Sequence, residues 1–246
     1  MGAAFGWGAV GGSALVVGAL IALVWRIPPR LLGMVMGFGA GVLVSALAYD
    51  LVEEAVDTSA GTGGVAAGLL TGAVVFFVGD AVIDRMGGND RKASDGSQAE
   101  GSGLAIVLGA VLDGIPESIV LGLGLLSGDG VSVAFVAAVF VSNLPEGLAA
   151  TTGLAASGWS RGRVLLLWAG VALVSALAAL VGYVAFDDAA PATVAFVLAF
   201  AGGAILCMLA DTMMPEAFRN EGRLVGLFTA AGFALAFALH TAEAGG

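Results

Sequence analysis

Two short stretches in the most apolar part of the chain, Leu112-Asp-Gly-Ile-Pro-Glu-Ser118 and Val141-Ser-Asn-Leu-Pro-Glu-Gly147, repeat one pattern of a polar residue, a proline and a glutamate. In both stretches the polar residue precedes the glutamate by four positions, which places the two on one face of a helix. These residues are Asp113 and Glu117 in the first stretch, and Ser142 and Glu146 in the second.

Each stretch also has a proline that interrupts the hydrogen bonding of its helix. Pro116 and Pro145 have no amide hydrogen, so the carbonyl groups one helical turn earlier lose their usual partners. Those carbonyls belong to Leu112 and Val141, and they become available to a ligand. Two kinked helices that each carry a carboxylate and a freed carbonyl predict a cation site.

The composition predicts an integral membrane protein. Hydrophobic residues make up 59% of the 246 residues and charged residues only 11%, which is too apolar for an ordinary water-soluble surface. The 40 glycines fit close helix packing in lipid. The single cysteine, Cys207, excludes an internal disulfide and a cysteine-based metal cluster. The net charge of -10 argues against a nucleic-acid partner and leaves the lipid bilayer as the expected one.

The apolar runs predict an all-α fold of eight transmembrane helices within a single domain, residues 1–246. The expected spans are residues 5–25, 31–56, 63–83, 104–126, 131–157, 162–186, 192–217 and 223–241. Residues 84–103 are rich in Gly, Ser and charge, and they predict a flexible cytoplasmic loop between the third and fourth spans.

The basic residues predict the orientation of the spans. All nine lie in the connections after the first, third, fifth and seventh spans: Arg26, Arg30, Arg85, Arg91, Lys92, Arg161, Arg163, Arg219 and Arg223. Since Lys and Arg in short loops stay in the cytoplasm, both termini are expected outside, in a multi-pass protein of the cell (plasma) membrane.

Internal similarity predicts a 3+2+3 inverted-repeat arrangement. Residues 37–55 align without gaps to residues 199–217, in two spans that cross in opposite directions. The identical pairs are Phe38/Phe200, Gly41/Gly203, Leu47/Leu209, Ala48/Ala210, Glu54/Glu216 and Ala55/Ala217. The fourth and fifth spans, which carry the two motifs, are likewise inverted. Such repeats with broken helices are typical of secondary transporters that have a site at the membrane midplane.

The deepest ionisable residues predict oxygen ligation of a divalent metal cation. Asp113, Glu117 and Glu146 supply carboxylates, and Ser142 and Asn143 supply neutral oxygens. The alternative for the carboxyls is a protonated form that serves packing alone. For Asn143, a hydrogen bond between helices is an equal alternative.

Three further carboxylates are candidates for a cation pathway: Asp50, Asp211 and Glu216. For Asp50 and Asp211, a solvated position near a helix end is an equal alternative, and for Glu216 it is the favoured interpretation. Asp80 is expected to cap the inner end of the third span. His240, the only histidine, is expected to be an interfacial residue near the outer end of the last span.

These motifs resemble those of the ZIP family of metal-ion transporters. The family's His-Asn-x-Pro-Glu-Gly pattern is matched by Ser142-Asn-Leu-Pro-Glu-Gly147 except at the leading His, and Asp113-Gly-Ile-Pro-Glu-Ser118 keeps the Pro-Glu pair. Asp50-Leu-Val-Glu-Glu-Ala55 and Met213-Met-Pro-Glu-Ala217 resemble further family segments. The resemblance covers most of the chain, and it implies eight spans with both termini outside.

By this resemblance, Glu117, Glu146 and Asn143 are metal ligands. Asp113 stands where the first motif has its histidine, and Ser142 is a weaker substitute in the second. Loss of the imidazoles makes the ligand set harder, which favours manganese, ferrous iron or magnesium, with zinc as the family default.

The sequence therefore predicts transport of a divalent metal cation into the cytoplasm by alternating access. It predicts no enzymatic activity and no cofactor besides the transported ion. Two alternatives remain: a metal-binding membrane sensor without flux, and a proton-coupled carrier of a small organic cation. The glycine-rich faces fit packing within the bundle and a homodimer equally well.

Overall fold

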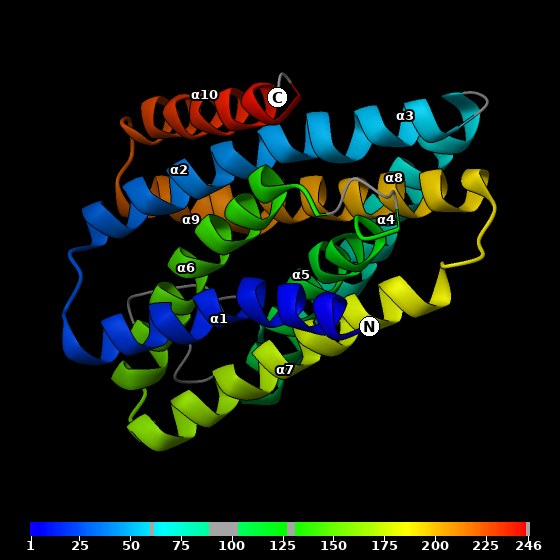
Figure 1. The fold of residues 1–246 in the computed structure, drawn as a ribbon. Coiled ribbons are helices and arrows are strands. Elements are labelled where there is room, and N and C mark those ends of the chain that lie inside the picture. The colour runs from blue at the N-terminus through cyan, green and yellow to red at the C-terminus, as the bar shows by residue number, and fades with distance from the viewer. Residues whose placement is uncertain (60–61, 89–102, 127–130, 245–246) are drawn as a thin grey trace.

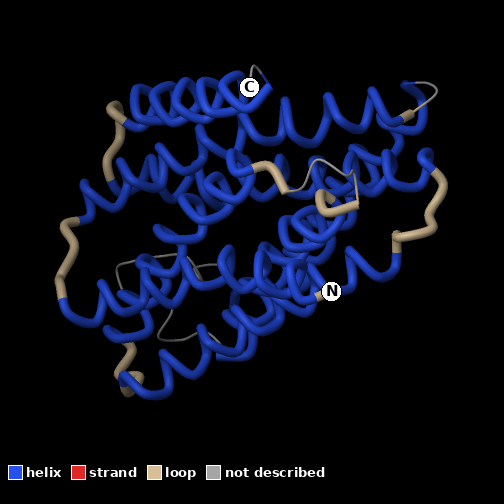
Figure 2. The backbone as a smooth tube through the Cα atoms, in the orientation of Figure 1, coloured by secondary structure: helices blue, strands red, loops and turns tan. Residues whose placement is uncertain are grey.

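The computed structural model describes residues 1–59, 62–88, 103–126 and 131–244. Within these ranges the chain forms helices and short connections, with no strand (Figure 2). Eight helices in the described residues are long and apolar enough to cross a membrane, as the sequence predicts. The chain is thus a multi-span helical membrane protein.

The eight spans match the predicted runs to within a few residues at each end. Five are single helices: α1 (Gly2–Val24), α5 (Gly103–Leu123), α6 (Val133–Ala156), α7 (Arg161–Ala185) and α10 (Val225–Ala244). Three are composite: α2 (Pro29–Ala46) with η1 (Leu47–Glu53) and α3 (Glu54–Thr58), α4 (Thr62–Ile83) with η2 (Asp84–Gly88), and α8 (Pro191–Met208) with η4 (Leu209–Met213) and α9 (Met214–Asn220).

The second and seventh spans share a feature that the sequence analysis does not predict. Each begins with a proline in its first turn, where the missing amide hydrogen has no consequence. Each then widens into a π-helical turn, which starts at Leu47 in one span and at Leu209 in the other. These two leucines are aligned in the internal repeat, and π turns in helices are frequent at functional sites.

The third span corrects one prediction, that of Asp80. The end of this span, η2, has a kink at Gly87, where φ is 95° and the backbone is not helical, so residues 84–88 do not overturn the predicted loop, and residues 89–102 of that loop lie outside the described residues. Asp80 lies within α4 and is buried, so it does not cap a helix end.

The helices associate in two groups, which Figure 1 shows side by side. In one, α1 packs along α6 and α7, and α7 packs along α5. In the other, α2 packs along α10, and α8 packs along α4. A separate apolar cluster around the fully buried Trp168 is formed by residues of α1, α5, α6 and α7 alone.

Glycines bring several of these helices into backbone contact. A methyl group on Gly41 of α2 would overlap the carbonyl oxygen of Thr229 on α10. A methyl group on Gly203 of α8 would overlap the carbonyl oxygen of Leu69 on α4 in the same way. Small residues at such positions let helices approach closely where lipid supplies no hydrophobic driving force.

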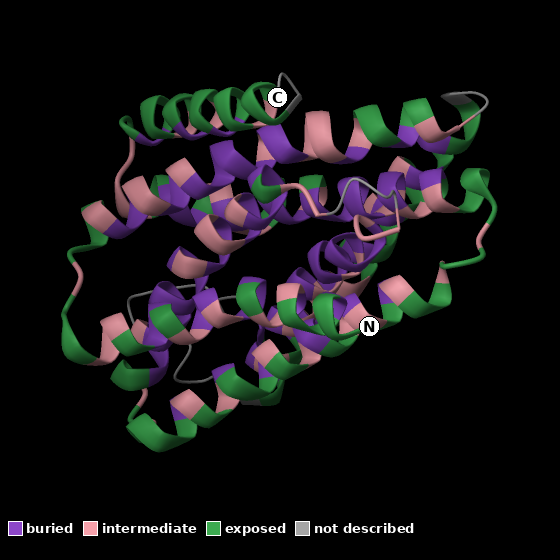
Figure 3. Cartoon of the chain, in the orientation of Figure 1, coloured by how far each residue is buried: buried purple, intermediate pink, exposed green. Residues whose placement is uncertain are grey.

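Burial is concentrated where the two groups meet, as the purple segments of α2, α5 and α6 show in Figure 3. The outer face of α10 and much of α4 and α7 are exposed and apolar, as expected of surfaces that face lipid. Polar residues buried in the central helices are therefore distant from water and need a specific explanation.

Successive spans alternate in direction, so their ends lie on two opposite sides of the bundle. The side toward the left of Figure 1 is called the basic end here, because it carries every described arginine: Arg26, Arg30, Arg85, Arg161, Arg163, Arg219 and Arg223. The opposite side, with Asp57, Asp187, Asp188 and Glu243, is called the acidic end.

Candidate functional site

The two motif helices stay continuous through their prolines. Pro116 lies inside α5 and Pro145 inside α6, and neither ends its helix. The carbonyls of Leu112 and Val141 therefore lack the amide partner that an unbroken helix would supply. The two helices touch each other only slightly, because α5 packs mainly on α7 and α6 mainly on α1.

All five predicted ligands are buried. None of these residues exposes more than 9% of its surface, in helices that are otherwise mostly apolar. The five residues are Asp113, Glu117, Ser142, Asn143 and Glu146. Burying so many polar groups within a membrane-spanning bundle is costly, and such residues usually serve a site or pathway.

Both neutral ligands have hydrogen bonds within the protein. The Ser142 hydroxyl donates to the carbonyl of Val139, one turn earlier in α6, at 3.0 Å. The Asn143 amide nitrogen donates to the carbonyl of Gly11 on α1 at 3.3 Å. The hydrogen bond between helices, weighed above for Asn143, is therefore present. It fixes the orientation of the side chain that also carries the amide oxygen.

The freed carbonyl of Val141 lies beside a second helix. A Cβ atom on Gly39 of α2 would sit 3.2 Å from this oxygen and 3.3 Å from the Cα atom of Ser142. A larger residue at position 39 would therefore crowd this part of α6. The second motif thus lies at the contact between the two helix groups.

Within the part of the chain that the structure describes, no three His, Cys, Asp or Glu side chains converge closely enough to hold a metal ion. A cation at the predicted ligands would need neutral oxygens as well as carboxylates around it. Hard divalent cations accept such a mixed set of oxygen ligands. The ligand assignment stays a prediction.

Asp50, one of the predicted pathway residues, lies in the π turn η1 and is partly buried. Its Oδ1 atom accepts a hydrogen bond from the Ser132 hydroxyl at 3.0 Å and lies 3.3 Å from Nδ1 of His240. His240 is therefore an Asp50 partner, with its ring 5.3 Å from that of Tyr49, and not simply an interfacial side chain.

The other two pathway residues differ in exposure. Asp211, in η4, is exposed and accepts a hydrogen bond from the Cys207 thiol at 3.2 Å. Glu216 is buried, and its carboxylate is 2.9 Å from a guanidinium nitrogen of Arg219 and accepts from the Asn220 amide at 2.8 Å. The favoured interpretation of Glu216 as a solvated end charge is wrong, because the residue is only 4% exposed.

Sequence analysis missed two residues that join this network. Ser132 is the N-cap of α6, and Glu243 accepts hydrogen bonds in the first turn of that helix. A serine just before a long apolar run is a recognised N-cap signal and could have been read for Ser132. Nothing local in the sequence pairs it with Glu243, which is 111 positions later.

The fold and its buried polar residues define a multi-span membrane protein whose interior holds carboxylates. No family model matches the chain. Over 198 residues, or 79% of its length, it is 27% identical to a protein of Arabidopsis thaliana that is named as a candidate zinc transporter. The aligned part is 31% of that protein, so this chain spans about a third of the length of the relative it matches.

Proposed function

We propose that this protein carries a divalent metal cation into the cytoplasm, with the basic end inside and the acidic end outside the cell. The observation that carries the proposal is the burial of five oxygen-bearing side chains on two proline-interrupted helices, α5 and α6. Carboxylates, a serine, an asparagine and freed carbonyls form a ligand set suited to hard or borderline divalent cations.

Zinc is the first candidate for the substrate, since the similar Arabidopsis protein is named for zinc. Manganese, ferrous iron and magnesium follow from the oxygen-only ligand set. Glu117 and Glu146 would neutralise the dication. Asp113, Ser142 and Asn143 would complete the shell, as the resemblance to the ZIP family implies. Asp50, Asp211 and Glu216 would line the route at either end.

Glycine packing supports an inverted repeat as the basis of alternating access. Gly41 and Gly203 are aligned in the repeat, and each lies against a carbonyl of its neighbouring helix. The contacts are reciprocal: Gly232 of α10 lies against the Phe38 carbonyl, Gly72 of α4 lies against the Phe200 carbonyl, and Phe38 and Phe200 are also aligned. The α2–α10 pair thus matches the α8–α4 pair, residue for residue.

The first and sixth spans support the same relation. Gly18 of α1 lies against the Leu144 carbonyl of α6, as Gly182 of α7 lies against the Ile119 carbonyl of α5. The reverse contacts are Gly147 against Leu15 and Gly122 against Ala179. These contacts match Gly147 of α6 with Gly122 of α5. The two Pro-Glu motifs instead match Glu146 with Glu117, so the two alignments of α5 with α6 differ by one helical turn. Two matched halves that surround one polar centre are typical of alternating-access transporters.

The test is uptake into proteoliposomes of zinc, manganese, ferrous iron, magnesium and cadmium, each supplied alone. We expect saturable uptake of at least one metal, abolished by the double substitution Glu117→Ala, Glu146→Ala. The matched control is Glu53→Ala, Glu54→Ala, which also removes two carboxylates but at exposed positions. Uptake in the control should stay close to that of the unmodified protein.

Three results would contradict the proposal, and each has a distinct meaning. Uptake that survives in the Glu117/Glu146 variant would remove these residues from the route. Metal binding without flux would indicate a sensor. Absence of both binding and flux, with uptake of a small organic cation that the metals do not compete with, would indicate an organic-cation carrier.

A further inference from the structure

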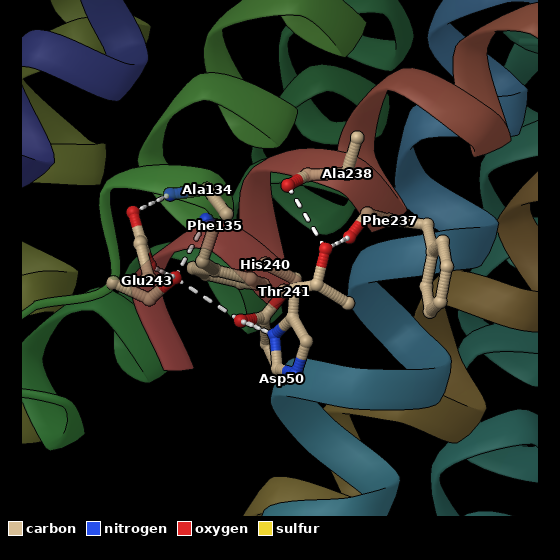
Figure 4. A network of polar contacts seen from close by, with 9 residues as sticks. Asp50, Ala134, Phe135, Phe237, Ala238, His240, Thr241 and Glu243 are labelled. Atoms are coloured by element: carbon tan, nitrogen blue, oxygen red, sulfur yellow. Dashed lines mark hydrogen bonds and ion pairs between the residues drawn. The ribbon is translucent and has the colours of Figure 1, made fainter. Parts of the chain in front are cut away.

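A polar network at the acidic end joins three helices that are far apart in the sequence (Figure 4). The carboxylate of Glu243, at the end of α10, reaches the first turn of α6. Its Oε1 atom accepts the amide hydrogen of Ala134 at 2.9 Å, and its Oε2 atom accepts from the Ser132 hydroxyl at 3.1 Å. Amide groups in the first turn of a helix have no partner within the helix, so these bonds satisfy an open donor.

Ser132 is the centre of this network. Its oxygen accepts the amide hydrogen of Phe135 at 3.0 Å, which caps α6. Its hydroxyl lies within hydrogen-bond distance of both Asp50 and Glu243, at 3.0 and 3.1 Å. A hydroxyl has one hydrogen to donate, so it alternates between the two carboxylates or divides the bond between them.

His240 attaches the same network to α10 one turn earlier. Its Nδ1 atom lies 3.3 Å from Oδ1 of Asp50, as the close-up shows. The ring of Tyr49, next to Asp50, lies 5.3 Å from the His240 ring and 5.2 Å from that of Phe237. Aromatic contacts of this kind fix the register of α10 against the second span.

These four residues, Asp50, Ser132, His240 and Glu243, are called the acidic-end latch below. They connect α6, which packs along α1, to α2 and α10, which pack along each other. The latch therefore bridges the two helix groups. It acts on the first turn of the helix whose later turns carry Ser142, Asn143 and Glu146.

We propose that the acidic-end latch closes this end of the junction between the two helix groups and has to open for the buried site to be reached from the acidic side. The inference rests on the proposed function, because it assigns the latch to the entry side of a transport cycle. Glu243 is exposed and His240 is partly exposed, so water can replace their contacts as the latch opens, while the Asp50 side chain is only 10% exposed. The positive end of the α6 dipole favours reclosure on the Glu243 carboxylate.

The test measures how easily a reporter below the latch is reached. Val136, buried one turn into α6, is replaced by Cys in a Cys207→Ser background, and the protein is placed in lipid nanodiscs. The rate of modification by a charged methanethiosulfonate reagent is then compared with and without Ser132→Ala or Glu243→Ala. We expect the rate to rise about tenfold in both, the change associated with losing a hydrogen bond to a charged group.

The chain offers a matched control at the opposite end. Ser160 caps α7 as Ser132 caps α6, and it accepts the amide hydrogen of Arg163 at 3.4 Å. Ser160→Ala removes a cap of the same kind, so the general loss of helix stability is about equal in the two serine variants. The reporter rate should stay unchanged in Ser160→Ala. Ser132→Thr, which keeps the hydroxyl, should restore the slow rate.

Equal rates in Ser132→Ala and Ser160→Ala, or a rate that does not rise in Glu243→Ala, would overturn the latch. If the Val136→Cys protein fails to fold, hydrogen exchange is measured without the reporter. The Ala134 amide is followed in Ser132→Ala and the Phe135 amide in Glu243→Ala, since each keeps its own acceptor there. Exchange faster than in Ser160→Ala would support the latch. Neither readout needs transport. Suppose that labelling is fast in the latch variants and that the unmodified protein transports no metal. This result would contradict the proposed function but would support the proposed role of the latch.

Discussion

The two ends of α6 are held by different partners and by different kinds of contact. Near the basic end, the indole N–H of Trp168 on α7 donates to the Thr151 hydroxyl at 2.7 Å, and both side chains are fully buried. At the acidic end, Glu243 and Asp50 reach the first turn from α10 and η1, and Glu243 is exposed. One end of α6 is therefore attached within its own group of helices, and the other is attached across the groups.

This difference indicates which end can move. Breaking the Trp168–Thr151 hydrogen bond would leave a donor buried without water, which costs about 1–3 kcal/mol. The contacts of Glu243 in the acidic-end latch can exchange for water at a much smaller cost, because Glu243 is exposed. We therefore expect α6 to stay with α1 and α7 while its acidic end separates from α2 and α10.

The largest expected effect comes from the basic end. Trp168→Ala removes the largest fully buried side chain and should lower the free energy of unfolding by about 3–5 kcal/mol, measured by denaturant titration in micelles. The reporter at Val136 should react at the unmodified rate. Trp25→Ala, at a half-exposed position, is the control and should change stability little. Reporter labelling as fast in Trp168→Ala as in Ser132→Ala would break the comparison between the two ends.

The next effect tests whether the helix pairs of the second group are equivalent. Gly41→Ala and Gly203→Ala each place a methyl group against a backbone carbonyl, and each should lower the unfolding free energy by about 1–3 kcal/mol. Gly226→Ala and Gly170→Ala, where a Cβ atom would meet nothing within 4 Å, should be close to neutral. A large loss at Gly41 with none at Gly203 would contradict the proposed relation between the α2–α10 and α8–α4 pairs.

Composition and periodicity were sufficient to predict the helical spans. Each apolar run is about as long as a membrane is thick, and each has become one helix or one composite helix. The π turns at Leu47 and Leu209 were not predictable in the same way, because their residues are ordinary helix formers. A wide turn depends on packing against neighbouring helices, which hydropathy does not report.

The candidate site was predicted in part. Deep burial of Glu117 and Glu146 follows from their position in long apolar runs, and the structure shows both buried. Glu216 was misjudged, since its place near the helix end suggested solvent, whereas its carboxylate is buried and pairs with Arg219 one turn later in the same helix, α9. The contact between Glu243 and Ser132 joins residues distant in sequence, and no local pattern encodes it.

A third prediction uses a difference between the two halves of the molecule. Continuing the packing register of Gly72 and Gly232 along α4 and α10 matches Asp80 with His240. A carboxylate in one half thus stands where the other half has an imidazole. His240→Asp should replace an attractive contact to Asp50 with a repulsive one and raise the reporter rate about tenfold.

His240→Gln is the control for this prediction. A glutamine side chain can still donate a hydrogen bond to Asp50 and adds no negative charge, so the reporter rate should stay close to that of the unmodified protein and below that of His240→Asp. Similar slow rates in all three proteins would mean that the Asp50–His240 contact does not hold the acidic end. The Ser132 and Glu243 contacts would then carry the closure.

The smallest expected effect separates charge from geometry in the acidic-end latch. Glu243→Gln keeps an oxygen that can accept the Ala134 amide hydrogen but removes the negative charge beside the N-terminus of α6. A charge in this position contributes about 0.3–1 kcal/mol, so the reporter rate should rise about two- to fivefold. Because Glu243 is exposed, the difference should shrink as salt is raised toward 1 M.

The sign of this last effect depends on which neighbour of Glu243 dominates. The α6 dipole attracts its carboxylate, whereas Asp50, which contacts the same Ser132 hydroxyl, repels it. Both carboxylate oxygens of Glu243 accept hydrogen bonds at the N-terminus of α6, whereas Asp50 meets Glu243 only through the shared hydroxyl, so we expect the attraction to prevail. A slower reporter rate in Glu243→Gln would show that repulsion between the two carboxylates prevails. The closed acidic end would then be held by hydrogen-bond geometry against its own charge, and a cation arriving there would tighten the latch instead of opening it.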